Sequence, residues 1–295
     1  MASEDIRVSD SSALARAPSA ALVVGAIASV QLGAAFAVSL FAWVGPAGAV
    51  FLRLTTASVV LFGVWRPRVR GRARRDVLLA AVFGAALAAM NLCFYGAIHR
   101  IPLGIAVSLE FVGPLAVAVV GSRRRIDLLW VSLGAVGIVA LTRGGTNSLD
   151  GVGIVLALLA GCLWAAYILL SARIGRVFER GTGLALAMAF GSVFLLPAGV
   201  IAGGSHLLEP RALALGAAVG LLSSAIPYSF ELEALRRIAP HTFAVLMSLE
   251  PAVAALAGFV VLGQDLGGRA LLGVALVVSA SIGASRATRS ASIDL

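Results

Sequence analysis

The sequence has 295 residues, of which 60% are hydrophobic and 13% are charged, and its mean hydropathy is +1.01. Ordinary soluble domains are roughly 45–50% apolar and about 25% charged. The composition therefore argues against a water-soluble enzyme, a nucleic-acid-binding protein and a disordered chain, and it indicates a polytopic protein of the lipid bilayer. The net charge of +9 lies in short gaps between apolar stretches, so it reports membrane topology and predicts no nucleic-acid partner.

All 23 basic residues are arginine, and the lack of lysine excludes several mechanisms. A Walker A loop and the Schiff bases of retinal and pyridoxal phosphate all need a lysine. The sequence also carries no metalloprotease or serine-hydrolase motif. Cys93 and Cys162 lie within apolar stretches and predict neither a disulfide framework nor a zinc site. We therefore expect no enzyme activity, no cofactor and no metal.

Ten apolar stretches are candidates for helices that cross the bilayer, the fifth being the shortest. They cover residues 19–41, 46–65, 77–98, 101–121, 128–142, 151–172, 182–202, 211–230, 239–262 and 267–285. The sequence thus predicts an all-α polytopic membrane protein of ten transmembrane helices. Residues 1–17 and 287–295 are expected to be tails, and residues 18–145 and 146–286 to be two units of five helices each.

The arginines in the gaps are strongly biased to one side of the predicted membrane. Eighteen lie on the side of the N-terminus, six of them between Arg66 and Arg75, and 4 lie on the opposite side. Positively charged loops favour the cytoplasmic side. We therefore expect both termini of a multi-pass membrane protein in the cytoplasm. The polar N-terminal tail lacks the pattern of a cleaved signal peptide.

A short motif occurs twice, about 140 residues apart. Ser108-Leu109-Glu110 is followed closely by Pro114, and Ser248-Leu249-Glu250 is followed directly by Pro251. The copies fall in the fourth and ninth predicted spans, and an offset of five spans reverses the orientation of the second unit. The pattern predicts two inverted five-helix repeats with a binding site near the membrane midplane, as in secondary transporters. Chance similarity between two apolar helices is the alternative.

Three charged side chains are predicted within the hydrocarbon, where charge is costly and each one is a candidate for function. Glu110 and Glu250 fall near the middle of their spans, each close to a proline that frees a backbone carbonyl. Arg53 lies nearer the extracellular end of the second span. The structural alternative is that Arg53 pairs with one glutamate and only holds helices together.

Uncharged polar residues complete the predicted substrate-binding set, which adds Gln31, Asn91, Tyr95, Ser108, Ser248, Trp164 and Tyr167 to the charged three. Hydrogen bonding between helices is an equal alternative for Gln31 and Asn91. Packing is the alternative for Trp164 and Tyr167.

Other polar positions are expected to lie outside the site. Glu231 and Glu233 are interpreted as a solvated ion-pair cluster with Arg236 and Arg237 at the cytoplasmic end of the eighth span. The first four spans and the sixth to ninth are expected to line a central cavity. The fifth and tenth spans, which carry no ionisable residue in their apolar stretches, are expected to lie outside it, as packing helices or as the contact of a homodimer.

Several stretches resemble the EamA branch of the drug/metabolite transporter superfamily, in particular the threonine/homoserine exporters of bacterial inner membranes. They are Ser29-Val30-Gln31 with Gly33, Leu52-Arg53-Leu54, Pro102–Val107 with Leu109-Glu110-Phe111 and Gly113–Ala118, Pro227-Tyr228-Ser229, and Leu246–Ala252. The resemblance covers nearly the whole chain beyond the N-terminal tail. One departure is Gly263-Gln264, because many EamA proteins have Gly-Glu after the ninth span.

The resemblance implies secondary export of a small amino acid, such as threonine or homoserine, by alternating access. An arginine and a glutamate also suit the two ends of a zwitterion. Protons are the expected coupling ion, because no nucleotide motif exists and an apolar cavity favours a neutral glutamate. We expect Arg53 and Glu110 to hold the amino acid and Glu250 to carry the proton. An exporter of another metabolite or a drug, and a non-transporting scaffold or sensor, are the alternatives.

Overall fold

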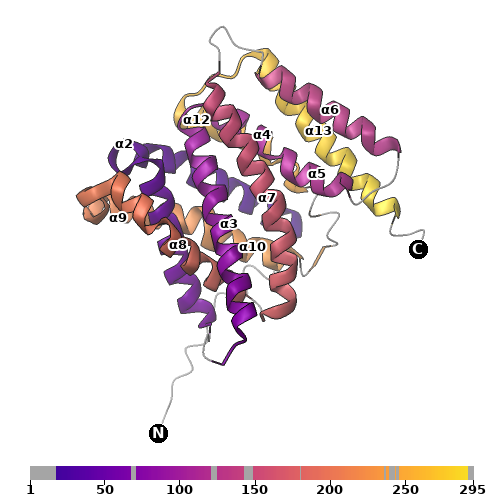
Figure 1. Ribbon diagram of the computed structural model, residues 1–295. Helices are drawn as coiled ribbons and strands as arrows, with labels where there is room; N and C mark the ends of the chain where they lie inside the picture. Colours follow the sequence, from indigo (N-terminus) through magenta and orange to yellow (C-terminus); the bar gives the residue numbers. More distant parts are fainter. Residues whose placement is uncertain are drawn as a thin grey trace.

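The computed structural model describes residues 18–67, 71–120, 125–142, 149–179, 181–235, 237–238, 243 and 246–291. Within these ranges every regular element is helical (Figure 1). In chain order the elements are α2 (Ser19–Trp65), α3 (Arg74–Ile98), α4 (Leu103–Glu110), α5 (Val112–Val120), α6 (Arg125–Thr142), α7 (Gly151–Val177), α8 (Thr182–Gly203), η1 (Gly204–Leu208), α9 (Pro210–Gly220), η2 (Leu221–Ala225), α10 (Ile226–Leu235), α12 (Glu250–Leu262) and α13 (Gly268–Ala291).

The first two predicted spans form one element, α2, with a bend between them. Gly45 has φ 65° and ψ 170°, outside the helical region, and Pro46 follows it. A side chain would be strained at this positive φ, and proline cannot donate the backbone hydrogen bond of a continuous helix. The predicted break at Gly45-Pro46 is therefore confirmed.

Among the described residues, five helices are long and apolar enough to cross a membrane by length and composition. They are Ser19–Trp65, Arg74–Ile98, Gly151–Val177, Thr182–Leu208 and Pro210–Tyr228. Leu103–Val117, Glu250–Leu262 and Gly268–Gly283 are shorter apolar helices. The all-helical membrane class is confirmed, and the count of ten spans in two inverted repeats stays a prediction. Residues 239–242, at the predicted start of the ninth span, lie outside the described residues.

The two segments that carry the repeated motif are interrupted beside their glutamates. α4 ends at Glu110, Phe111 forms a turn, and α5 begins at Val112. Ser248 and Leu249 form another turn, and α12 begins at Glu250. The eighth predicted segment is also irregular, because the π-helical turn η2 separates α9 from α10. Such turns change the phase of the side chains that follow, and they are frequent at functional sites.

α6 and α13 form a pair at one edge of the bundle (Figure 1). Gly134 of α6 lies against Ala280 of α13, and Gly137 lies against Val277. Because rising positions on one helix meet falling positions on the other, the two helices run antiparallel. Val136 on the outer side of α6 is exposed, whereas Val277 is buried between the two helices.

Small residues bring other helices close together. Gly104 of α4 meets α12 at Ala255, where an added Cβ would lie 2.6 Å from the alanine Cα. Gly216 and Gly220 of α9 face α2, and a Cβ on Gly216 would lie 2.8 Å from that of Leu52. Close backbone approach of this kind is typical of helix association in membranes.

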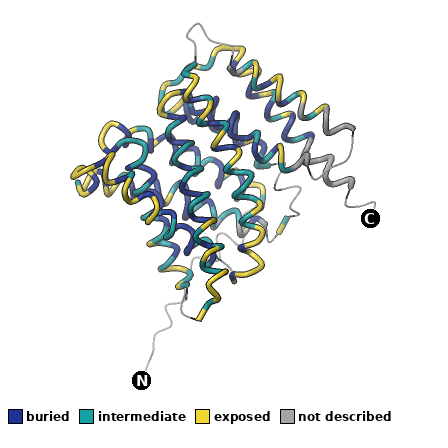
Figure 2. The backbone as a smooth tube through the Cα atoms, in the orientation of Figure 1, coloured by how far each residue is buried: buried dark blue, intermediate teal, exposed yellow. Residues whose placement is uncertain are grey.

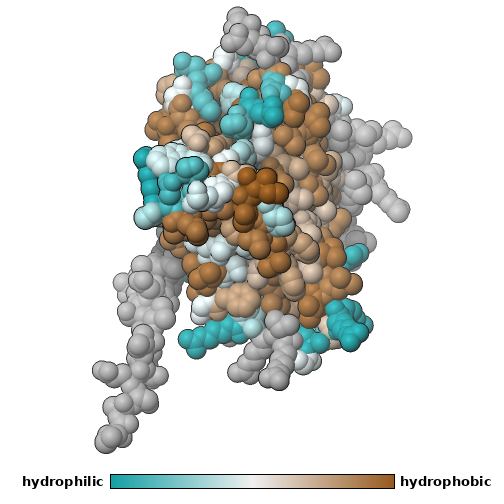
Figure 3. Space-filling model, turned by 60° about the vertical axis from the view of Figure 1, so that its left-hand side comes forward, coloured by the Kyte–Doolittle hydropathy of each residue, from teal (hydrophilic) through white to brown (hydrophobic). Residues whose placement is uncertain are grey.

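The outer surface is apolar over much of the bundle. Val59, Val155, Val193, Ile201 and Val260 are 63–85% exposed. Figure 3 shows hydrophobic residues across the middle of one face, with hydrophilic residues towards its upper left and lower parts. Figure 2 shows the buried residues on the inner sides of the helices. An apolar surface of this extent is unfavourable in water, so we assign it to contact with lipid.

Candidate functional site

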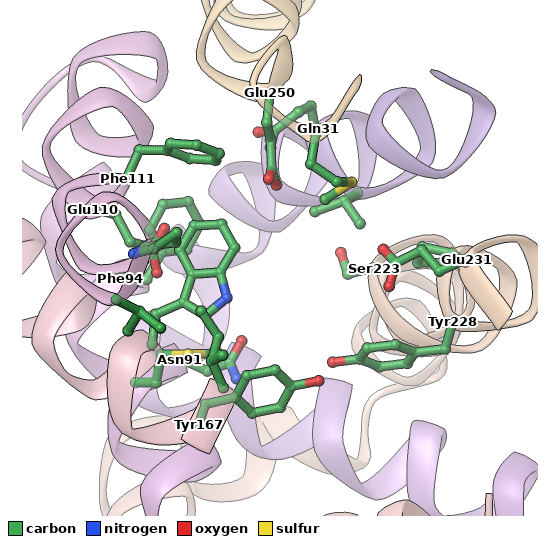
Figure 4. Close-up of a pocket in the computed structure, with 18 of the residues that line it drawn as sticks. Gln31, Asn91, Phe94, Glu110, Phe111, Tyr167, Ser223, Tyr228, Glu231 and Glu250 are labelled. Atoms are coloured by element: carbon green, nitrogen blue, oxygen red, sulfur yellow. The ribbon is translucent and has the colours of Figure 1, made fainter. Parts of the chain in front are cut away.

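A cavity of about 460 Å³ lies inside the bundle (Figure 4). Its volume falls within the range of small-molecule sites, about 300–1,000 Å³. Apolar side chains such as Phe94, Phe111 and Met247 form part of its wall. The polar, charged and amphipathic lining residues are Gln31, Arg53, Asn91, Glu110, Trp164, Tyr167, Ser223, Tyr228, Glu231, Glu250 and Ser281.

The helices that line the cavity differ from the prediction at two places. α8, the seventh predicted span, contributes no lining residue among those described. Its small residues instead pack against α2 and α3, as where Gly84 of α3 meets the backbone of Ala187. α13, predicted to lie outside, contributes Ser281, whose Oγ is 2.8 Å from that of Ser248 at the turn before α12.

Arg53 brings a positive charge to the cavity from the second half of α2, and only 7% of the residue is exposed. Its Nη2 donates to the Ser223 carbonyl at 3.0 Å, its Nε to Ser224 Oγ at 3.4 Å, and its Nη1 to the Tyr95 hydroxyl at 3.4 Å. Both serines belong to η2, so the π-helical turn supplies two of the three partners.

The guanidinium of Arg53 has no carboxylate within 4.0 Å among the described residues. The expected alternative, an ion pair that only holds helices together, is therefore not present in this part of the chain. A buried charge without a counter-ion is costly unless a ligand supplies one.

Glu110, the last residue of α4, presents its carboxylate to the cavity (Figure 4). No described residue donates a hydrogen bond to this carboxylate. Behind it, Gly161 of α7 lies so close that an added Cβ would be 2.5 Å from the Glu110 carbonyl oxygen. The backbone of Glu110 is thus held by a neighbouring helix while its carboxylate stays open.

Glu250, the first residue of α12, is bonded where Glu110 is not. Gln31 Nε2 donates to Glu250 Oε1 at 3.1 Å, which links α2 to α12. Glu250 Oε2 and Gln31 Oε1 are buried and have no partner among the described residues.

Seven of the ten residues predicted for the site line the cavity. The structure places the other three behind its wall. The fully buried Tyr95 supports Arg53 through its hydroxyl. Ser108 donates to the Gly104 carbonyl of its own helix at 2.7 Å, and Ser248 bonds Ser281. These three residues are placed to position other groups and do not face the cavity.

Four of the polar and amphipathic lining residues are not in the predicted set: Ser223, Tyr228, Glu231 and Ser281. Glu231 was assigned to a solvated cluster, but it lies on the cavity wall with Tyr228 one turn before it (Figure 4). The side chain of Glu233 lies outside the described residues. The signal that could have found this region is Ser223-Ser224, two adjacent hydroxyls in an otherwise apolar helix.

Gln264 stands where the family resemblance leads one to expect a glutamate. Its Oε1 accepts a hydrogen bond from Leu103 N at 3.0 Å. The first backbone N–H groups of a helix have no partner within the helix. Gln264 therefore caps the start of α4, and it does not line the cavity.

A helical bundle around a polar, partly charged cavity is the architecture of a membrane transporter, and the comparisons with known proteins agree. The model of the EamA-like transporter family matches residues 151–286. The chain belongs to the EamA family of the drug/metabolite transporter superfamily, and it is a transporter and not an enzyme.

Curated relatives extend the match to nearly the whole chain. The threonine/homoserine exporter RhtA of Salmonella typhimurium strain SL1344 is 40% identical over 266 residues, 90% of this chain and 90% of the relative. That of Escherichia coli K12 is 40% identical over 270 residues, 91% of each chain. The uncharacterized transporter YwfM of Bacillus subtilis is 28% identical over 81% of this chain and 83% of its own.

The fold is shared with a solved crystal structure at 18% sequence identity. The TM-score is 0.61, and the match covers 91% of this chain and 98% of the other.

Proposed function

We propose that this protein is a secondary active exporter of small amino acids, with threonine and homoserine as its substrate class, in a bacterial inner membrane. Its 40% identity to relatives named threonine/homoserine exporters supports the substrate class. The observation that carries the proposal is Arg53, a buried guanidinium at the cavity with no carboxylate partner among the described residues. A substrate carboxylate is the natural counter-ion for it.

The two ends of an amino acid fit two separate groups of the cavity. A guanidinium has five N–H donors, and protein acceptors use three of those of Arg53, so two are left for a carboxylate. Glu110 offers an open carboxylate to the ammonium group. The end of α4 at Glu110 adds the negative end of a helix dipole, which favours a cation there.

Alternating access between two inverted five-helix halves is the proposed transport mechanism. The antiparallel pairing of α6 with α13 supports it, because an inverted repeat relates these two helices to each other. The interruptions beside Glu110 and Glu250 support it too, since discontinuous helices often form transporter sites. Both termini are proposed to be cytoplasmic on the arginine bias of the loops.

Proton antiport is the proposed energy source, and Glu250 is the proposed proton carrier. It is buried at the cavity, and one of its oxygens has no partner among the described residues. A carboxyl group in such surroundings can exist in the neutral form.

The test is counterflow of labelled threonine and homoserine in proteoliposomes, with and without a pH gradient. We expect both amino acids to exchange, and a gradient directed for export to drive net flux. Arg53→Ala should abolish exchange of both. Threonine flux that does not respond to the gradient would remove proton coupling, and absence of flux in any gradient would favour a scaffold or sensor.

The charge balance of the cavity favours one second candidate, export of a cationic metabolite or drug. Glu110, Glu231 and Glu250 line the cavity with Arg53, so carboxylates outnumber guanidinium groups among the described lining residues. A cation would need the glutamates and not Arg53. An Arg53→Ala variant that still protects cells from a cationic drug would support this candidate over amino-acid export.

A further inference from the structure

The bonded pair of Gln31 and Glu250 is chemically incomplete. Gln31 Nε2 donates to Glu250 Oε1 at 3.1 Å. Gln31 Oε1 and Glu250 Oε2 are both buried, and neither has a hydrogen-bond partner among the described residues. Both atoms are acceptors when Glu250 is ionised, and a buried acceptor without a donor is costly. The pair therefore lacks one donor.

A single proton supplies the missing donor to both atoms. If Glu250 carries a hydrogen on Oε2, this hydroxyl can donate to Gln31 Oε1 while Gln31 Nε2 still donates to Oε1. The two side chains then form a ring closed by two hydrogen bonds, in which every donor faces an acceptor. The amide of Gln31 can also be placed with its oxygen and nitrogen interchanged. The ring still forms in that orientation, with the hydrogen on the other oxygen of Glu250.

The charged and titratable groups around Glu250 do not offer it another partner. Arg53 donates to η2 and to a tyrosine. Glu110 and Glu231 face the same cavity and repel an ionised Glu250 electrostatically. Tyr228 of α10 also faces the cavity and bonds no carboxylate among the described residues. α13 brings Ser281 to the cavity, an uncharged hydroxyl.

We propose that Gln31 is a positioning residue that bonds the protonated form of Glu250 at both carboxyl oxygens, and that this doubly bonded pair is a contact between the two halves of the molecule. The proposal rests on the proposed function, in which Glu250 carries the proton. Loss of the proton removes the second hydrogen bond and leaves Gln31 Oε1 and Glu250 Oε2 without a donor, so α2 and α12 keep only the bond from Gln31 Nε2. Protonation of one carboxyl group thereby adds or removes one of two hydrogen bonds between these helices.

Infrared spectroscopy tests the pair directly. Difference spectra of the purified protein between alkaline and acidic pH report the C=O stretch of protonated carboxyl groups, and the Glu250 band is identified by its loss in Glu250→Gln. A carboxyl group hydrogen-bonded at both oxygens absorbs at lower frequency than a free one. We expect Gln31→Leu to move the Glu250 band to higher frequency. The matched control is Asn91→Leu, which removes a buried amide bonded only to its own helix among the described residues and should leave the band in place.

A Glu250 band that stays in place in Gln31→Leu overturns the proposal. So does a band at the free-acid frequency in the unaltered protein, a comparison that does not require Gln31→Leu to fold. In proteoliposomes, Gln31→Leu is expected to lower the ratio of pH-driven export to amino-acid exchange. If the Glu250 band behaves as expected but the protein transports no amino acid, the result would support the bonded pair and overturn the proposed function.

Discussion

The segments around Glu110 and Glu250 share the residues Ser-Leu-Glu, yet the structure surrounds the two glutamates differently. Both are buried at the cavity beside an interruption of the helix. Glu110 closes α4 and receives no hydrogen bond from a described residue, whereas Glu250 opens α12 and is bonded by Gln31. The serines differ too: Ser108 bonds its own helix, and Ser248 reaches α13.

The difference indicates that the motif sets where a carboxylate lies and that its neighbours set what it can do. The repeated residues bring a glutamate to the cavity wall twice. The close approach of Gly161 acts on one copy. The amide of Gln31 acts on the other. Two copies of one motif can therefore hold different ligands, which under the proposed function are an ammonium group and a proton.

The largest expected effect separates the two glutamates by function. Glu110→Gln removes the carboxylate that faces the ammonium group, and a hydrogen bond to a charged group contributes about 1.5–3 kcal/mol. We expect homoserine to bind about 10- to 100-fold more weakly to this variant. Glu250→Gln should retain amino-acid exchange and lose pH-driven export. Counterflow and gradient-driven flux of labelled homoserine measure the two effects.

Normal behaviour of both variants in both assays would contradict the assigned roles. The carboxylates would then be structural, and the site would lie among the uncharged lining residues. If each variant showed the result expected of the other, the two glutamates would still differ in function, but Glu110 would carry the proton and Glu250 would bind the amino acid.

The close contact behind Glu110 gives the next effect, on stability. A Cβ on Gly113 of α5 would overlap the backbone carbonyl of Gly161 on α7. We expect Gly113→Ala to destabilise the protein by about 1–3 kcal/mol, as overpacking does in rigid cores. Thermal unfolding in detergent measures the change. Gly175→Ala on the exposed face of α7 is the control, because an added Cβ there meets nothing within 4 Å.

Much of the site could be predicted because charge inside hydrocarbon is rare. Arg53, Glu110 and Glu250 were visible as charges in apolar stretches, and all three line the cavity. The break at Gly45-Pro46 was visible because these residues disfavour a continuous helix. Counting residues from the start of a span gives the position of a side chain along the span. It therefore finds residues that lie near the middle of a span.

The other features of the site depend on how each helix is rotated about its axis and on where each helix ends. Counting residues along the sequence reveals neither. Tyr95 and Ser108 have the right depth but point away from the cavity. The turn η2 and the continuation of α10 to Leu235 bring Glu231 to the cavity wall, although its sequence neighbours Arg236 and Arg237 had indicated a solvated position. Irregular turns of this kind depend on tertiary packing, so periodicity alone could not predict them.

The serines of the two motif copies give a smaller effect. Ser248→Ala removes a bond between helices, and such bonds in membrane proteins average about 0.6 kcal/mol with a maximum near about 1.7. Ser108→Ala removes only a bond within one helix turn, so we expect a change within about 0.5 kcal/mol. Unfolding of both variants in the same detergent gives the comparison. Equal losses would show that the two copies are held alike.

The smallest effect concerns an acidic residue that begins a helix outside the membrane-spanning segments, in contrast to Glu250. Asp150 caps α7 by accepting hydrogen bonds from the backbone N–H groups of Val152 and Gly153. It also accepts a hydrogen bond from Arg100 at 2.8 Å. The bond from Arg100, together with the two backbone bonds, lowers the pKa of Asp150. Since the pKa is lower in the folded state, the added stability is present above the unfolded value of about 3.9 and is lost as the pH falls through the folded pKa. Asparagine also caps helices well, so Asp150→Asn should lower the melting temperature slightly at neutral pH, and the difference from the unaltered protein should vanish in acid. A difference that persists at low pH would mean that the cap, and not the charged pair with Arg100, is the stabilising contact.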